Sequence, residues 1–105
     1  MRVLFVCNQN MHRSKTAEEL FKGQFETRSA GLYHNQVTAE DLEWADIIAV
    51  MEDEQRAELS RRFPAHYLQK RIVSLKIPDT FYYNQDELKR LLSANVRELL
   101  EPLIE

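Results

Sequence analysis

The sequence predicts a three-layer α/β/α fold, in which a parallel sheet of four strands lies between two layers of helices. Val3–Val6 form an unbroken apolar run near the start of the chain, as expected of a central strand buried on both faces. Strand-like and helix-like segments then alternate, which implies right-handed crossovers between parallel strands. A leucine-rich stripe at helical spacing closes the chain. At this length we expect one domain over residues 1–105.

The segments after the first strand can be assigned in order. Residues 14–22 place apolar side chains at helical spacing, with glutamates in the early turns and Gly23 just beyond, so they predict a helix. Residues 25–30 alternate only weakly, a pattern that suits an edge strand better than a central one. Thr38 is expected to start a short helix, because the acid three residues later, Asp41, resembles a capping box.

The second half of the chain adds two strands and two helices. Ile47–Met51 form a third β-prone apolar run. Residues 53–63 begin with acids and end with arginines, as the helix dipole favours, and Pro64 is expected to help end that helix. Residues 71–75 predict the fourth strand. Residues 87–103 carry the leucine-rich stripe and predict the final helix.

Composition and charge argue against several classes of protein. The net charge of −3 and the scattered basic residues disfavour a nucleic-acid surface. The apolar runs are too short to span a bilayer and the N-terminus lacks the apolar stretch of a signal peptide, so we expect a cytoplasmic protein. The single cysteine, Cys7, cannot form an internal disulfide, and it lacks partners for a zinc site. We expect no metal and no cofactor, and Cys7 is either an inert buried residue or a chemically used thiol.

The turn after the first strand contains the residues that point to chemistry. Cys7 ends the strand, Arg13 follows after five intervening residues, and Ser14 places a hydroxyl at the start of a helix. The intervening backbone N–H groups can curl inward and form an anion-binding nest beside the helix N-terminus, at the sheet edge where α/β folds bind ligands. We expect phosphate, sulfate or vanadate to bind in a loop formed by Asn8, Gln9, Asn10, Met11, His12, Arg13 and Ser14.

This loop would also activate the cysteine. The positive end of the helix, the Arg13 guanidinium and the Ser14 hydroxyl favour thiolate over thiol at Cys7, and the thiolate is the nucleophile. Arg13 can offer two parallel donors to phosphate oxygens, which a lysine cannot do with the same geometry. Taken singly, Cys7 would be read as a small buried hydrophobe and Ser14 as an ordinary helix cap. Their combination with Arg13 at a strand-to-helix turn favours the anion site.

This pattern, in which a cysteine after an N-terminal strand is followed by five residues and then by Arg13-Ser14, resembles the low-molecular-weight protein tyrosine phosphatase family. Asn10 stands where that family has an asparagine that orders the loop, and residues 16–18 and 29–31 resemble family segments that follow it. The resemblance extends to the final helix. It implies a phosphatase I-like fold with strand order 2-1-3-4 and protein tyrosine phosphatase activity.

Three departures from the family pattern concern the phosphate-binding loop and the substrate pocket. Gln9 stands where the family has a glycine, and His12 stands where it often has a second cysteine. The chain is shorter between Gly31 and Thr38, a region that in the family contributes to the substrate pocket.

The resemblance also implies a general acid. A late aspartate in the loop after the fourth strand has that role in the family, and Asp79 is the matching residue here, with Asp86 as the alternative. Tyr82 and Tyr83 would line the substrate pocket, although loop tyrosines also pack on a core by one face. On this reading, Cys7 attacks phosphorus, Asp79 protonates the leaving oxygen, and water hydrolyses the phosphocysteine with Asp79 as base.

The same residues leave other functions open. A phosphate- or phosphoprotein-binding module on this fold would use the loop without turnover, and loss of phosphate release in Cys7→Ser would separate the two. Arsenate reduction would need further cysteines or an external thiol to resolve the thiol adduct. The substrate is also open: phosphotyrosine in a protein or peptide, as the resemblance implies, or a smaller phosphomonoester.

Overall fold

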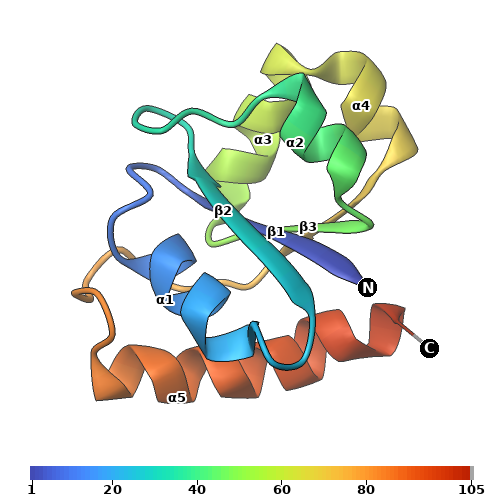
Figure 1. Cartoon of the computed structure of the whole chain (residues 1–105). Helices are drawn as coiled ribbons and strands as arrows, with labels where there is room; N and C mark the ends of the chain where they lie inside the picture. The colour runs from blue at the N-terminus through green and yellow to red at the C-terminus, as the bar shows by residue number, and fades with distance from the viewer. Residues whose placement is uncertain (105) are drawn as a thin grey trace.

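The strands of the computed structural model, which describes residues 1–104, form one parallel sheet in the order β2-β1-β3-β4 (Figure 1). The strands are β1 (Arg2–Cys7), β2 (Glu26–Gly31), β3 (Ile47–Val50) and β4 (Arg71–Ser74). All three neighbouring pairs are parallel, with Val3 opposite Thr27 and Ile47 across the two sides of β1. The expected strand order is confirmed, including the position of β2 at an edge.

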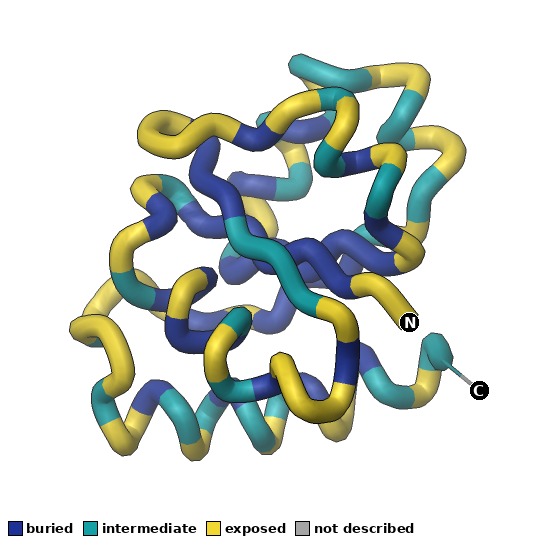
Figure 2. Tube along the Cα trace, viewed as in Figure 1, coloured by how far each residue is buried: buried dark blue, intermediate teal, exposed yellow. Residues whose placement is uncertain are grey.

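β1 lies at the centre and is buried on both faces. The side chains of Val3, Phe5 and Cys7 belong to one core cluster, and those of Leu4 and Val6 to a second cluster on the opposite face. This division follows from the two-residue repeat of a strand, which sends successive side chains to opposite sides. Figure 2 shows the result as a continuous buried stripe through the middle of the molecule. β1 is therefore a rigid support for the loop that follows it.

Helices cover the two faces of the sheet as separate layers (Figure 1). One face carries α1 (Arg13–Phe21) and α5 (Asp86–Asn95), which pack against each other and against the cluster that contains Cys7. The other face carries α2 (Ala39–Trp44), α3 (Asp53–Arg62) and α4 (Pro64–Gln69). The three-layer α/β/α architecture is thus present. No helix of residues 1–104 is both long and apolar enough to cross a membrane.

The predicted start of α2 is confirmed in atomic detail. The Thr38 hydroxyl accepts from the Asp41 N–H at 3.1 Å, and the Asp41 carboxylate accepts from the Thr38 N–H at 3.1 Å. This reciprocal pair satisfies two backbone donors that the first turn of a helix leaves free.

The expectation for Pro64 was incomplete. The preceding helix does end before it, at Arg62, but Pro64 is also the first residue of a further helix, α4, that the sequence reading missed. Proline suits a first helical position because its fixed φ is helical and its missing N–H would have no partner there. With no buried residue in α4, there was no apolar periodicity to reveal it.

The prediction of one continuous helix over residues 87–103 was only partly correct. α5 ends at Asn95, and the chain continues through a π-helical segment, Val96–Leu100, and a 3₁₀ turn, Glu101–Leu103. Pro102 has no N–H and its ring would meet the carbonyl four residues back, so an α-helix cannot continue through it. The apolar stripe continues through this change of helix type. Its members at four-residue spacing are all buried: Leu88, Leu92, Val96 and Leu100.

Candidate active site

The loop between β1 and α1 lies at the carboxyl edge of the sheet. Cys7 is the last residue of β1 and is buried, and Arg13 is the first residue of α1. The N–H of Leu32 donates to the carbonyls of Cys7 and Asn8 at 3.0 and 2.9 Å, which fixes the start of the loop to the chain that leaves β2. The predicted strand, loop and helix therefore hold the cysteine and the arginine at opposite ends of one turn.

A cavity of about 290 Å³ opens at this turn. It is lined by Cys7, Asn8, Gln9, Met11, His12, Arg13 and Asp79. Asp79 comes from the loop after β4, far from the others in sequence. The three residues expected to be catalytic thus share one cavity.

The Cys7 sulfur sits beside two buried polar side chains. Its Sγ lies 2.9 Å from Ser14 Oγ, and Asn10 Nδ2 donates to the same Ser14 Oγ at 2.8 Å. Asn10 has a φ of 52°, in the left-handed region that asparagine tolerates better than most residues. Because the Ser14 oxygen accepts from Asn10, its own hydrogen is available to Cys7. A hydroxyl donor at that distance stabilises the thiolate form.

The Arg13 guanidinium is almost completely buried, with 2% of the side chain exposed. Its Nη1 donates to Glu52 Oε1 at 2.5 Å and to the carbonyl of Ile77 at 2.7 Å. Its Nη2 lies 3.6 Å from Asp79 Oδ1, an ion pair with a largely exposed carboxylate. The helix dipole disfavours a cation in a first turn, and here the carboxylate of Glu52 compensates it.

The floor of the loop is held by a buried glutamine. Gln55 Oε1 accepts from the N–H groups of Met51 and Glu52 at 2.8 and 3.0 Å, and its Nε2 donates to Asn8 Oδ1 at 3.2 Å. Since Gln55 belongs to α3, these bonds tie the start of that helix to the loop.

Gly31 lets the chain that leaves β2 pass close to the loop. A Cβ at this position would lie 2.2 Å from the carbonyl oxygen of His34, 2.9 Å from that of Asn8 and 3.0 Å from the nitrogen of Asn10. Any side chain would therefore push two backbone segments apart at the site.

The loop after β4 contacts the candidate site through His12. The Tyr83 N–H donates to His12 Nδ1 at 3.1 Å, and the Tyr82 ring meets the His12 ring edge-on at 5.6 Å. The Asn84 N–H donates to Thr16 Oγ1 at 2.8 Å. These contacts dock the segment that follows Asp79 onto the start of α1.

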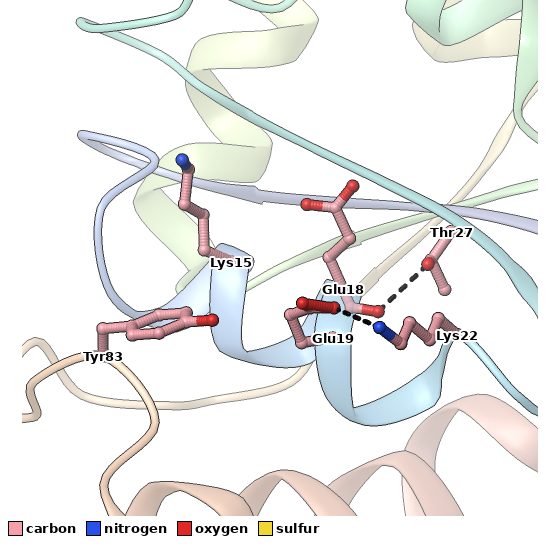
Figure 3. A pocket seen from close by; sticks show the side chains of 6 residues that line it. All are labelled: Lys15, Glu18, Glu19, Lys22, Thr27 and Tyr83. Atoms are coloured by element: carbon pink, nitrogen blue, oxygen red, sulfur yellow. Dashed lines mark hydrogen bonds and ion pairs between the residues drawn. The ribbon is translucent and has the colours of Figure 1, made fainter.

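The two tyrosines themselves do not line the cavity at Cys7. Tyr82 is 75% exposed, and Tyr83 borders a different hollow, of about 390 Å³, beside α1 (Figure 3). The other residues that line this second hollow are Lys15, Glu18, Glu19, Lys22 and Thr27. The alternative acid, Asp86, is the exposed first residue of α5, is paired with Lys89 at 3.5 Å, and is not among the residues that line the cavity at Cys7.

The sequence matches no family model, and no curated relative matches it. Solved structures do match. The YwlE arginine phosphatase from Geobacillus stearothermophilus superposes with a TM-score of 0.74 at 22% identity, over 92% of this chain and 91% of the other. SP-PTP, a low-molecular-weight protein tyrosine phosphatase from Streptococcus pyogenes, gives 0.75 at 19% identity, over 92% and 89%. The chain has the fold of the low-molecular-weight protein tyrosine phosphatases.

The Cys7-to-Ser14 segment could be proposed as a site from the sequence because its residues are contiguous. The contacts of Glu52 and Gln55 were not predicted from the sequence. The need for a glycine at position 31 was not recognised either. One signal in the sequence could have pointed to Glu52: it is an acid two residues after a buried strand, at the edge where the loop lies. Within residues 1–104, no group of three or more histidine, cysteine, aspartate or glutamate side chains could hold a metal ion.

Proposed function

We propose that the protein is a phosphatase that acts through a phosphocysteine on Cys7, with phosphotyrosine in proteins or peptides as its substrate. The observation that carries the proposal is the shared cavity, which brings the Cys7 sulfur, the Arg13 guanidinium and the Asp79 carboxylate to one place. A buried thiol, a buried guanidinium and an exposed acid are the three groups that phosphoryl transfer through cysteine requires.

Arg13 would receive the phosphate without losing its anchors. Its Nη1 is held by Glu52 and the Ile77 carbonyl, so Nε and Nη2 remain for two phosphate oxygens. Asp79 Oδ1 lies 3.6 Å from Nη2, and a bound phosphate would take its place there. The Asp79 side chain, 62% exposed, has the freedom to swing toward the leaving oxygen.

The first half-reaction forms the phosphorus–sulfur bond and breaks the bond from phosphorus to the leaving oxygen. Asp79 gives its proton to that oxygen. In the second half-reaction, Asp79 takes a proton from water as the water oxygen attacks phosphorus, and the Cys7 thiolate leaves. A YwlE variant whose active-site serine is phosphorylated, with the same fold at 22% identity, supports a covalent intermediate at this position.

A second substrate class to be tested is phosphoarginine in proteins or peptides. Three of the similar structures are described as YwlE, two of them as an arginine phosphatase, and phosphoarginine presents the same phosphoryl group on nitrogen in place of oxygen. The thiolate and Arg13 would serve either substrate, whereas the atom that Asp79 protonates differs.

Release of inorganic phosphate tests the proposal. We would measure it from p-nitrophenyl phosphate, a phosphotyrosine peptide and a phosphoarginine peptide, for wild type and for Cys7→Ser, Arg13→Ala and Asp79→Asn. Asp86→Asn is the matched control, because it makes the same replacement outside the cavity. We expect Cys7→Ser to be inactive, Asp79→Asn to lose roughly 10²- to 10⁴-fold in kcat, and Asp86→Asn to keep wild-type activity.

The pH profile adds a second readout. Because the first step needs Cys7 ionised and Asp79 protonated, kcat/KM should peak on the acidic side of neutrality, and Asp79→Asn should lose that peak. A profile that is flat from about pH 5 to 7 would contradict the assigned roles. A protein that binds vanadate but releases no phosphate from any substrate would instead be a phosphate-binding module.

A further inference from the structure

A chain of side-chain hydrogen bonds runs from the surface loop after β2 to the Cys7 sulfur. Asn35 Nδ2 lies 2.6 Å from Asn10 Oδ1, Asn10 Nδ2 lies 2.8 Å from Ser14 Oγ, and Ser14 Oγ lies 2.9 Å from Cys7 Sγ. Asn35 lies outside the Cys7-to-Ser14 segment, in the stretch that joins β2 to α2. The chain therefore links a residue with no place in the cavity to the proposed nucleophile.

Each link of this chain has a direction. An amide nitrogen only donates, an amide oxygen only accepts, and a hydroxyl can do both with a single hydrogen. When Asn35 donates to Asn10 Oδ1, the Asn10 amide must turn its nitrogen to Ser14, and the Ser14 hydrogen is left for Cys7. If the chain ran the other way, Ser14 would donate to Asn10 and could only accept from Cys7. The first direction suits a thiolate, and the second suits a thiol.

The backbone around Asn35 is built to hold that side chain in place. The Gly31 N–H donates to the Asn35 carbonyl at 3.0 Å, and the Tyr33 N–H donates to the Asn8 carbonyl at 2.9 Å. Asn35 has a φ of 49°, so both amides of the relay, Asn35 and Asn10, stand at left-handed positions. Glycine and aspartate also tolerate such a position, which allows replacements that keep the backbone.

We propose that Asn35 is a positioning residue for the reaction: its amide N–H, relayed by Asn10 and Ser14, turns the Ser14 hydroxyl toward the Cys7 thiolate. The inference rests on the proposed function, in which Cys7 is the nucleophile. It assigns to the loop after β2 a control over how much of the thiolate is present at a given pH.

Asn35→Asp is the decisive replacement, because it keeps the shape but exchanges the donor for a group that only accepts. Asn10 would then turn its nitrogen to the carboxylate and its oxygen to Ser14, and the Ser14 hydrogen would be drawn away from Cys7. Asn35→Gly removes the side chain and leaves Asn10 free to take either orientation. Gln36→Glu is the matched control for charge, since it adds one carboxylate to the same exposed loop at a residue other than the one that donates to Asn10.

The readout is the pH dependence of iodoacetamide alkylation, which reports thiolate, and Cys7 is the only cysteine in the sequence. Measurements in 0.5 M NaCl screen the added charge. We expect Asn35→Asp to move the midpoint of the alkylation profile up by about one pH unit and Asn35→Gly by less than half of that. Gln36→Glu should stay near wild type. The acidic limb of the kcat/KM profile, which reports ionisation of Cys7, should move up in pH together with the alkylation midpoint in Asn35→Asp.

A second measurement tests the route. In a Ser14→Ala background, Asn35→Asp should produce no further shift, because the relay passes through the Ser14 hydroxyl. The inference is overturned if Asn35→Asp shifts the midpoint no more than Gln36→Glu, if Asn35→Gly shifts it equally far, or if the shift persists in Ser14→Ala. Alkylation needs no substrate, so a relay that behaves as expected in a protein without phosphate release would overturn the proposed function alone.

Discussion

Glu52 offers the sharpest test of how the site is held together. Glu52→Gln keeps an acceptor for Arg13 Nη1 but removes the charge that compensates a guanidinium only 2% exposed. Removal of one partner of a buried ion pair costs about 3–5 kcal/mol. Glu52 is one-third exposed and glutamine preserves one hydrogen bond, so we expect a loss of about 2 kcal/mol in the free energy of unfolding. For a chain of this size, that corresponds to a fall in Tm of about 10 °C.

The same replacement should strengthen oxyanion binding. The Glu52 carboxylate opposes the approach of a phosphate to Arg13, and its neutralisation removes about 1–2 kcal/mol of repulsion at the effective dielectric of a partly exposed site. We therefore expect the Kd for vanadate to fall about tenfold. At the same vanadate concentration, Glu52→Gln should regain more stability than wild type, because the stabilisation by a ligand is RT ln(1 + [L]/Kd) and so grows as Kd falls.

Thermal denaturation and vanadate titration measure both effects. The control is Glu54→Gln, which makes the same change two residues along the chain at an exposed position, and it should cost less than about 0.5 kcal/mol. The reasoning fails if Glu52→Gln lowers Tm no more than this control does. Weaker vanadate binding in Glu52→Gln would show that the carboxylate matters through the orientation of Arg13 and not through its charge.

Two further predictions concern the loop and the pH dependence of stability. Gly31→Ala would place a Cβ 2.2 Å from a backbone oxygen, so we expect a loss of at least about 2 kcal/mol in chemical denaturation, whereas Gly23→Ala, with nothing within 4 Å, should be neutral or slightly stabilising. Hydrogen bonds from Arg61 and Arg62 lower the pKa of Glu58 from 4.5 to about 2. Its contribution to stability is therefore complete above about pH 4.5 and is lost as the pH falls toward 2, so Glu58→Gln should flatten the Tm profile over that interval.

The fold could be predicted because its main determinants are local. Val3–Val6 is apolar at every position, and such a run close to the start of the chain is typical of a strand covered on both faces. The capping pair at Thr38 and the stripe of the last helix are equally short-range signals. α4 could not be predicted in the same way, because a six-residue helix with no buried residue leaves no apolar periodicity. The π-helical segment could not be predicted either. An α-helix cannot continue through Pro102, and the geometry that replaces it depends on how the apolar residues of the last helix pack on the core.

The site was predictable only where its residues are neighbours in sequence. Cys7 and Arg13 belong to one turn, whereas the association of Asp79 with that turn came from a family resemblance. Glu52 and Asn35 reach the site across the sheet edge from other connections, and an isolated glutamate or asparagine in a connection is usually a surface residue. What distinguishes these two is the buried group that each one contacts, and no spacing in the sequence expresses such a contact.

The anchors of Arg13 explain why the proposed phosphate site would need an arginine at the end of this turn. Two N–H donors of its guanidinium are occupied by Glu52 and the Ile77 carbonyl, and these anchors come from two different connections of the sheet. A lysine in the same place has three donors and would have at most one left for a ligand. The planar fork leaves Nε and Nη2 on its other edge, already oriented before any phosphate arrives. In the proposed reaction, phosphate binding would then require no reorganisation of the cation, and preorganised charge of this kind stabilises a phosphoryl group in transfer.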